Sequence, residues 1–186
     1  QARLLEGRRV GPVLISLFVQ GEVRKLDPEG AGDHIDALFR AAWAMSGSRQ
    51  IAEDLVQETY VKVLSRPRLL RRDDDLGYLV KALRNTWYSH LRKERVRREV
   101  TDPGSQPPED FPARSSRDDP QAALEATEVL EALAALPEPY RETLAAVDVA
   151  GLSYAEAARA LGVRQGTVMS RLHRGRDQLA RGLQPG

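Results

Sequence analysis

The sequence of 186 residues contains no cysteine, and this absence excludes several kinds of chemistry at once. Without thiols the chain cannot build a disulfide framework, bind zinc through thiolates or use a cysteine nucleophile. Its three histidines, His34, His90 and His173, stand far apart in the sequence, and it contains no P-loop, HExxH motif or nucleophile elbow. We therefore predict that the protein is not an enzyme and uses no metal or organic cofactor.

Long hydrophobic runs are also missing. The longest one, Val10 to Val19, contains Pro12 and is far shorter than the roughly 20 residues that span a bilayer. No small-residue cleavage site follows it, so it does not read as a signal peptide. We expect no membrane insertion and a cytoplasmic location.

The net charge of +1 hides a strong segregation of charge along the chain. Between Lys81 and Arg98 there are seven basic residues and one acid, whereas between Glu99 and Glu142 there are 11 acids and three arginines. A second basic group follows, made of Arg159, Arg164, Arg171, Arg174, Arg176 and Arg181. Two basic segments on either side of an acidic one favour two contacts with a polyanion such as DNA, although solvated helix faces give the same pattern.

Hydrophobic residues at helical spacing predict three helices in the first half, over about 33–45, 50–65 and 76–98. Asp33 and Asp36 suit the start of the first helix, and Pro67 follows the end of the second. The positions expected on the buried faces are Ile35, Leu38, Phe39 and Ala42, then Ala52, Leu55, Val56, Thr59 and Val63, then Leu76, Leu79, Val80, Leu83, Trp87 and Leu91.

Residues 101–120 contain five prolines and almost no hydrophobic side chain, so they cannot offset the entropy lost on folding. We interpret them as a flexible acidic linker. Helical spacing resumes over about 121–136 and 140–149. The predicted fold class is therefore all-α: two small helical domains, 33–100 and 121–186, joined by this linker and preceded by an extension, 1–32, of uncertain role.

The last two predicted helices form a helix-turn-helix. Ser153 and Glu156 have the spacing of a capping box, and Gly162 suits the left-handed end of the first helix. A second, basic helix is expected over about 166–183, with Val168, Leu172 and Leu179 buried. Thr167, Arg171 and Arg174 share a different face, which could enter a major groove. A generic helical hairpin gives the same capping pattern, but the arginine-rich face favours DNA binding.

Three stretches together resemble the extracytoplasmic-function sigma factors, group 4 of the bacterial sigma-70 family. They are AEDLVQETYVKVL (52–64), LGYLVKALRNTWYSHLRKERVRRE (76–99) and LSYAEAARALGVRQGTVMSRLHRGRDQL (152–179), in the order and spacing of that family. The resemblance implies a subunit that binds core RNA polymerase, recognises promoter DNA and starts transcription.

The resemblance also assigns roles to residues of the first domain. One helix face, spaced i, i+3, i+4 and i+7, would grip the polymerase through Asp54, Gln57, Glu58 and Val61. The minus-ten element would be melted and bound by Arg84, Asn85, Tyr88, Ser89, Arg92, Lys93 and Arg95. Asn85 stands where family members hold a flipped base, and an amide suits a base edge because it both donates and accepts hydrogen bonds. The resemblance places Thr86 to Ser89 at a loop and helix start, but we interpret Trp87 as core packing.

In the second domain the minus-thirty-five element would be read by Arg164, Gln165, Thr167, Ser170, Arg171 and Arg174. The family further implies control by an anti-sigma factor, which would cover the functional faces, whereas inhibition by residues 1–32 is the competing hypothesis. The acidic linker could imitate RNA inside the polymerase or act only as a tether.

Two other classes of protein remain open on sequence grounds. A dimeric helix-turn-helix regulator would need a dimerisation face, and the sequence has no heptad seam. A helical nuclease would need clustered metal ligands, which the sequence does not show.

Overall fold

The protein is described by a computed structural model over residues 23–26, 28–65, 69–71, 75–101 and 120–183. The first half holds helices α2 (Pro28–Gly32), α3 (Ile35–Ser46), α4 (Arg49–Ser65) and α5 (Asp75–Thr101). The second half holds α6 (Pro120–Ala134), α7 (Glu138–Leu144), the π-helix η1 (Ala145–Val149), α8 (Tyr154–Leu161) and α9 (Gln165–Gly182). The predicted all-α class is confirmed, while most of the 1–32 extension and the interior of the linker lie outside the described residues.

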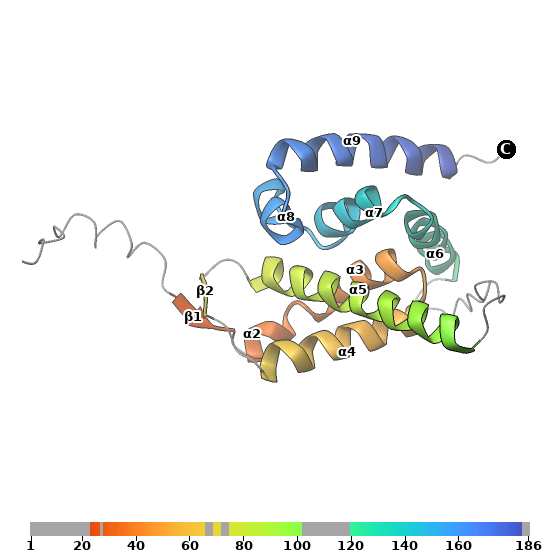
Figure 1. Ribbon diagram of the computed structural model, residues 1–186. Coiled ribbons are helices and arrows are strands. Elements are labelled where there is room, and N and C mark those ends of the chain that lie inside the picture. Colours follow the sequence, from red (N-terminus) through yellow and green to blue (C-terminus); the bar gives the residue numbers. More distant parts are fainter. Residues whose placement is uncertain (1–22, 27, 66–68, 72–74, 102–119, 184–186) are drawn as a thin grey trace, which may run out of the picture.

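A short pair of strands accompanies the helices of the first half. Strand β1 (Val23–Lys25) pairs antiparallel with β2 (Leu69–Arg71), so that the segment before α2 is joined to the segment between α4 and α5 (Figure 1). The sequence analysis did not anticipate this pair, because two strands of three residues each give no usable alternation.

The buried face of the first half agrees with the predicted pattern at most positions. All five residues predicted in α4 are buried, and so are Leu79, Val80, Leu83 and Trp87 of α5. Two expectations were wrong: Ile35 is 47% exposed and Leu91 is 38% exposed. Ile35 is the first residue of α3 and lies at the edge of the core. Leu91 lies beyond Trp87, after which no described side chain of α5 is buried.

The start of α3 also differs from the prediction. His34, not Asp33, is the residue before the helix, and its side chain makes no capping hydrogen bond. Its backbone carbonyl instead accepts from the amide of Leu38, and its own amide donates to the carbonyl of Ala31 in α2. A backbone hydrogen bond thus ties the residue before α3 to the end of α2.

The helix-turn-helix forms as its sequence predicts. The Ser153 hydroxyl accepts from the amide of Glu156, and the Glu156 carboxylate accepts from the amide of Ser153, so both halves of the capping box are present. These hydrogen bonds lower the pKa of Glu156. Gly162 ends α8 with φ 69°, in the left-handed region where glycine has no steric penalty.

Within the predicted helix over 140–149 the backbone hydrogen-bond pattern changes from α to π, and no sequence pattern predicted this. It begins as α7 and continues as the π-helix η1, where the amide of Ala150 donates to the carbonyl of Ala145 at 2.9 Å. Asp148 on η1 then accepts two hydrogen bonds from Arg176 of α9, at 2.9 Å and 2.6 Å. These bonds raise the pKa of the Arg176 guanidinium and fix α9 against η1.

Gly175 marks the closest approach of α9 to α7. A Cβ at this position would lie 2.9 Å from Leu144 Cδ1 and 3.2 Å from Tyr140 Cβ. A Cβ at Gly166, in the same helix, would meet nothing within 4 Å. The absence of a side chain at position 175 therefore sets the spacing of the two helices.

We expect Gly175→Ala to lower the free energy of unfolding by about 1–2 kcal/mol, because overpacking outweighs the better helix propensity of alanine. Gly166→Ala gains the propensity without the collision and is expected to be neutral or stabilising by up to about 1 kcal/mol. Urea unfolding followed by circular dichroism compares the two variants. A stabilising Gly175→Ala substitution would show that the neighbours of Gly175 give way without cost.

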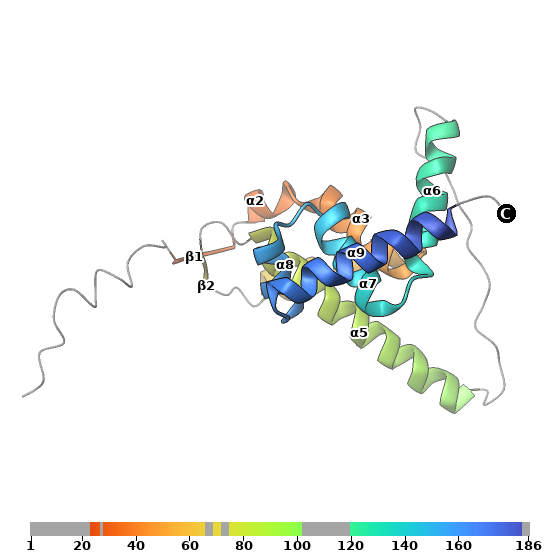
Figure 2. The same cartoon turned by 90° about the horizontal axis from the view of Figure 1, so that it is seen from above.

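The two halves of the chain pack directly on one another. Helix α3 contacts η1 and α6, and α5 contacts α8 (Figures 1 and 2). Ala42 and Ala44 of α3 are both fully buried although, two positions apart, they lie on different sides of the helix, and Ala145 and Ala146 of η1 are 1% exposed. Small side chains let α3 lie between the two groups of helices, so one hydrophobic core runs through both.

Candidate polymerase and nucleic-acid interfaces

The predicted polymerase-binding face on α4 is largely open to solvent. Asp54 and Gln57 are exposed, and Val61 is 62% exposed. Leu64, one turn further, is 41% exposed. An exposed hydrophobic pair beside an acid is a surface suited to a protein partner.

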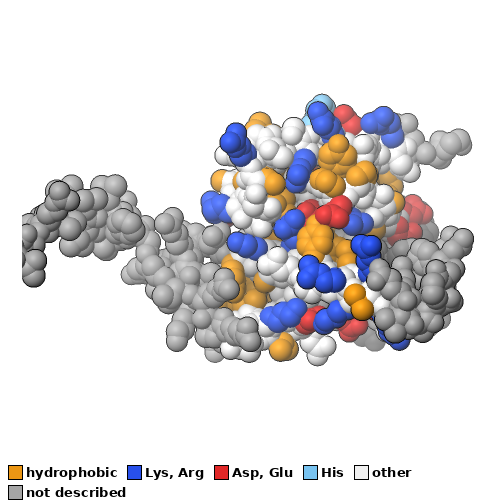
Figure 3. Space-filling model, in the orientation of Figure 1, with side chains coloured by type: hydrophobic (Ala, Val, Ile, Leu, Met, Phe, Trp, Pro, Cys, Tyr) orange, Lys and Arg blue, Asp and Glu red, His pale blue; other side chains and the backbone are white. Residues whose placement is uncertain are grey.

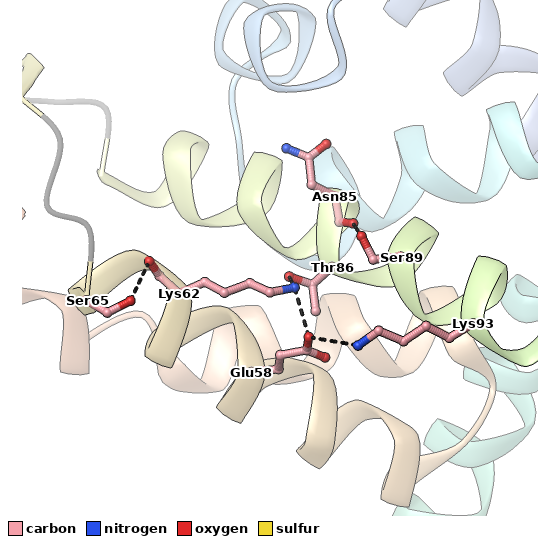
Figure 4. A network of polar contacts seen from close by, with 7 residues as sticks. All are labelled: Glu58, Lys62, Ser65, Asn85, Thr86, Ser89 and Lys93. Atoms are coloured by element: carbon pink, nitrogen blue, oxygen red, sulfur yellow. Dashed lines mark hydrogen bonds and ion pairs between the residues drawn. The ribbon is translucent and has the colours of Figure 1, made fainter.

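Glu58, the fourth predicted residue of this face, is used within the fold. Its carboxylate lies 2.9 Å from Lys62 Nζ and 3.7 Å from Lys93 Nζ, so it joins α4 to α5 (Figure 4). The hydrogen bond from Lys62 lowers the pKa of Glu58. Glu58 therefore differs from the other three residues of the set, which are exposed.

The predicted minus-ten residues lie on α5, which is continuous through residues 86–89, so the expected loop is absent there. Asn85 is exposed, and its side chain projects from the side of α5 opposite Glu58 (Figure 4). The Ser89 hydroxyl donates to the backbone carbonyl of Asn85 at 2.9 Å. The amide group of Asn85 is therefore presented to solvent from a rigid helix.

Trp87 packs in the core, as the sequence analysis predicted. It is 7% exposed and stacks on His90 with ring centroids 5.7 Å apart. Beside it, Thr86 is 1% exposed and accepts a hydrogen bond from Lys62 at 3.4 Å. The hydrogen bond between Lys62 and Thr86 joins α5 to α4.

Arg84 and Tyr88 contact the second half of the protein. Arg84 Nε donates to Glu142 Oε1 at 2.8 Å, and the Tyr88 hydroxyl donates to the carboxylates of Glu138 and Glu142. Arg84 also lies over the Tyr88 ring, 4.9 Å from its centroid. We call these four residues, Arg84, Tyr88, Glu138 and Glu142, the carboxylate clasp.

The environment of the carboxylate clasp shifts the pKa of Arg84 and of Tyr88. Burial opposes the charge on Arg84, but the hydrogen bond and the charge of Glu142 prevail and raise the pKa of the guanidinium. Burial, together with the hydrogen bonds to Glu138 and Glu142, raises the pKa of the Tyr88 hydroxyl. Tyr88 therefore stays protonated and acts as a donor, while Glu142, only 5% exposed, is held by two donors.

The sequence analysis did not identify Glu138 or Glu142 as functional residues. Both belong to the acidic segment between the basic groups, which is the only signal in the sequence that could have found them. Their partners lie 50 or more residues away along the chain, so no local pattern links them.

The basic end of α5 projects beyond the body of the protein (Figure 2). Arg92, Lys93 and Arg95, in the second half of this helix, are all exposed, and Lys93 is 72% exposed despite its ion pair with Glu58. On the face of the molecule seen in Figure 3, Lys and Arg side chains are spread over both halves of the chain, among hydrophobic and acidic ones. Such a distribution can hold phosphates without reading a sequence.

The predicted minus-thirty-five residues lie at the start of α9, the outermost helix in Figure 1. Of the six, Thr167 and Arg171 are partly exposed and the others, Arg164, Gln165, Ser170 and Arg174, are exposed. Met169, which the sequence analysis did not select, is 54% exposed among them. One face of a helix-turn-helix thus offers polar, cationic and apolar groups, which is the set that base edges and thymine methyl groups require.

Arg176 does not belong to this face, although it was counted in the basic group. Its guanidinium is engaged by Asp148, as described above. Within α9, Arg171 and Arg174 are therefore at least partly exposed, whereas Arg176 holds the helix against η1.

The described residues show neither a metal site nor a membrane span. No group of three or more metal-ligating side chains occurs among them. Within the same residues, no helix has the length and hydrophobicity needed to cross a bilayer.

Comparison with known proteins matches both halves of the chain to one family. The family model for Sigma-70 region 2 matches residues 32–97, and that for Sigma-70, region 4 matches residues 126–179. The ECF RNA polymerase sigma factor EcfG of Rhodopseudomonas palustris is 35% identical over 147 residues, which cover 78% of each chain. The ECF RNA polymerase sigma factor SigE of Mycolicibacterium smegmatis is 34% identical over 152 residues, 78% of this chain and 57% of that one, so the chain spans little more than half of SigE.

A solved structure has the same arrangement of helices. The sigma factor RpoE of Bartonella quintana, in complex with the anti-sigma factor NepR, matches with a TM-score of 0.65 and 28% identity, covering 83% of this chain and 94% of that chain. CnrH, solved with the cytosolic domain of CnrY, is 22% identical with a TM-score of 0.55 and shows the fold alone.

Proposed function

This chain belongs to the sigma-70 family, among the extracytoplasmic-function sigma factors, and from that premise we propose that it binds core RNA polymerase and directs it to a particular set of promoters. The residues proposed for each step lie on three separate surfaces. The exposed side of α4 binds the polymerase, α5 melts and reads the minus-ten element, and the start of α9 reads the minus-thirty-five element.

The observation that carries this proposal is the exposure of two different kinds of DNA-binding surface in one chain. The start of α9 presents Arg171 and Arg174 on a helix-turn-helix, as duplex recognition requires. Asn85 on α5 presents an amide beside the basic end of that helix, as recognition of an extruded base requires. A repressor that reads only duplex DNA has no use for the second surface.

The division of labour follows from the two domains, which we assign to residues 33–100 and 121–186. Neither DNA contact needs to be strong alone, because binding to the polymerase raises the effective concentration of each surface at the promoter. The family relationship to RpoE, solved with an anti-sigma factor, supports control of this chain by a separate inhibitor.

Titration with core RNA polymerase and a promoter library tests the proposal. A sigma factor gives transcription from a subset of promoters only when core polymerase is present. A dimeric regulator would bind duplex operators tightly without polymerase, and a nuclease would cut the DNA.

Asn85→Ala is expected to slow open-complex formation about tenfold on duplex promoters and to relax base preference within the minus-ten element, because the amide that holds the extruded base is lost. Closed-complex binding should change little. Permanganate footprinting on duplex and pre-melted templates measures both steps. Equal defects on the two templates, with unchanged base preference, would mean that Asn85 has only a structural role.

A further inference from the structure

Two residues proposed to read the minus-ten element are engaged within the protein itself. The carboxylate clasp bonds Arg84 and Tyr88 of α5 to Glu138 and Glu142 of α7. A carboxylate presents to a guanidinium the same pair of anionic oxygens that a phosphate presents. The start of α7 therefore occupies α5 with groups that resemble those of a nucleic-acid backbone.

This contact and a contact with DNA exclude one another. Glu142 is 5% exposed, so nothing else can approach Arg84 from that side while the clasp is closed. The hydroxyl proton of Tyr88 is already donated to carboxylates. Asn85, by contrast, is exposed, so only part of the reading face is covered.

The spacing of the two promoter elements leads to the same conclusion. Positions minus-ten and minus-thirty-five differ by 25 base pairs, or about 85 Å along straight duplex DNA at 3.4 Å per base pair. Helix α9 has 18 residues and α5 has 27, so they are about 27 Å and 40 Å long, and α5 packs on α8, the helix next to α9. Two surfaces held this close together cannot reach both elements at once.

We propose that Glu138 and Glu142 form an interaction surface whose partner is the minus-ten-reading face of α5 in the same chain, and that it competes with promoter DNA. The free protein then rests in a closed state, and only the open fraction can engage both promoter elements. This inference rests on the proposed function and adds to it a form of control that needs no second protein. Weakening the clasp should raise the open fraction and lower the concentration needed for transcription in the same proportion.

The test uses the full chain with Glu138→Gln and Glu142→Gln together, which remove both charges and keep the shape of the side chains. The matched control is Glu128→Gln with Glu131→Gln, which removes two charges from exposed positions of α6. Because the chain has no cysteine, Gln50→Cys and Ala180→Cys place one dye on α4 and one on α9 without competing sites. Transfer of fluorescence energy between the dyes then reports the separation of the two halves.

We expect the clasp variant, and not the control, to show lower energy transfer. The unlabelled clasp variant should also reach half-maximal transcription at about three- to tenfold lower concentration with core polymerase, because a larger fraction is open. Glu138→Lys, at an exposed position, gives a second variant that does not disturb the core, with Glu131→Lys as its control.

Unchanged energy transfer in both clasp variants would overturn the proposal, and so would opening without a change in the half-maximal concentration. An equal effect in the α6 controls would overturn it too, because the opening would then follow from the change in net charge and not from loss of the clasp. If the wild-type chain failed to transcribe any promoter with core polymerase, the proposed function would be wrong, and the fluorescence comparison would still decide whether these carboxylates hold the halves together.

Discussion

Replacing Asp54 and Val61 of α4 together by arginine is expected to weaken association with core RNA polymerase at least about a hundredfold, or about 2.7 kcal/mol, with no loss of helical content. Both residues are exposed, and the fold makes no visible use of either. Arginine at position 54 replaces a negative charge by a positive one, and arginine at position 61 replaces a hydrophobic side chain by a charged one. A polymerase surface complementary to the native face would lose both interactions.

Glu58 is left unchanged in this variant because it is ion-paired with Lys93 across the two helices. Replacing it would mix a loss of binding with a loss of packing. The matched control is Ile35→Arg with Asp36→Arg, which changes one exposed aliphatic residue and one exposed acid on α3 in the same way. Fluorescence anisotropy of labelled protein titrated with core polymerase gives the affinities. Equal affinity for the α4 variant and the wild type would refute the assignment of this face.

Arg171→Ala and Arg174→Ala are each expected to cost about 1–3 kcal/mol in binding to the minus-thirty-five element, about five- to 150-fold in affinity, if each arginine pairs with a guanine edge. Base preference should broaden at one position for each variant. Selection from a randomised minus-thirty-five library, with the polymerase complex, identifies those positions.

Arg176→Ala is the control for the recognition arginines, since it lies in the same helix but is bonded to Asp148. It should reduce the stability of the second half while leaving base preference unchanged. If Arg171→Ala or Arg174→Ala weakened binding to all sequences alike and reduced the salt dependence, that arginine would contact phosphate and not a base.

The elements that the sequence predicted well are those whose signal is local. The capping box of Ser153 and Glu156 lies within four residues, and the five buried positions of α4 follow one helical face. Both patterns arise from neighbours in the chain, so they hold whatever the rest of the protein does.

The features that were missed depend on contacts between distant parts of the chain. Arg84 and Glu142 are 58 residues apart, so no local pattern shows that their side chains meet. The exposure of Leu91 was missed because the hydrophobic spacing of α5 continues past Trp87, its last buried side chain among the described residues. Docking of the two halves was missed for the same reason, because the alanines of α3 fit equally well in an isolated domain.

The division of α9 at Gly175 bears on how new promoter specificities could be engineered into this scaffold. Before that residue the outer face of the helix is exposed, while Val168 and Leu172 on its inner face are buried and would be kept in any graft. From Gly175 onward it is constrained by the close approach to Leu144 and by the bond between Arg176 and Asp148. A transplanted recognition segment from another protein should therefore end at residue 174, so that the graft changes which bases are contacted while the angle at which the helix meets the groove stays that of the host.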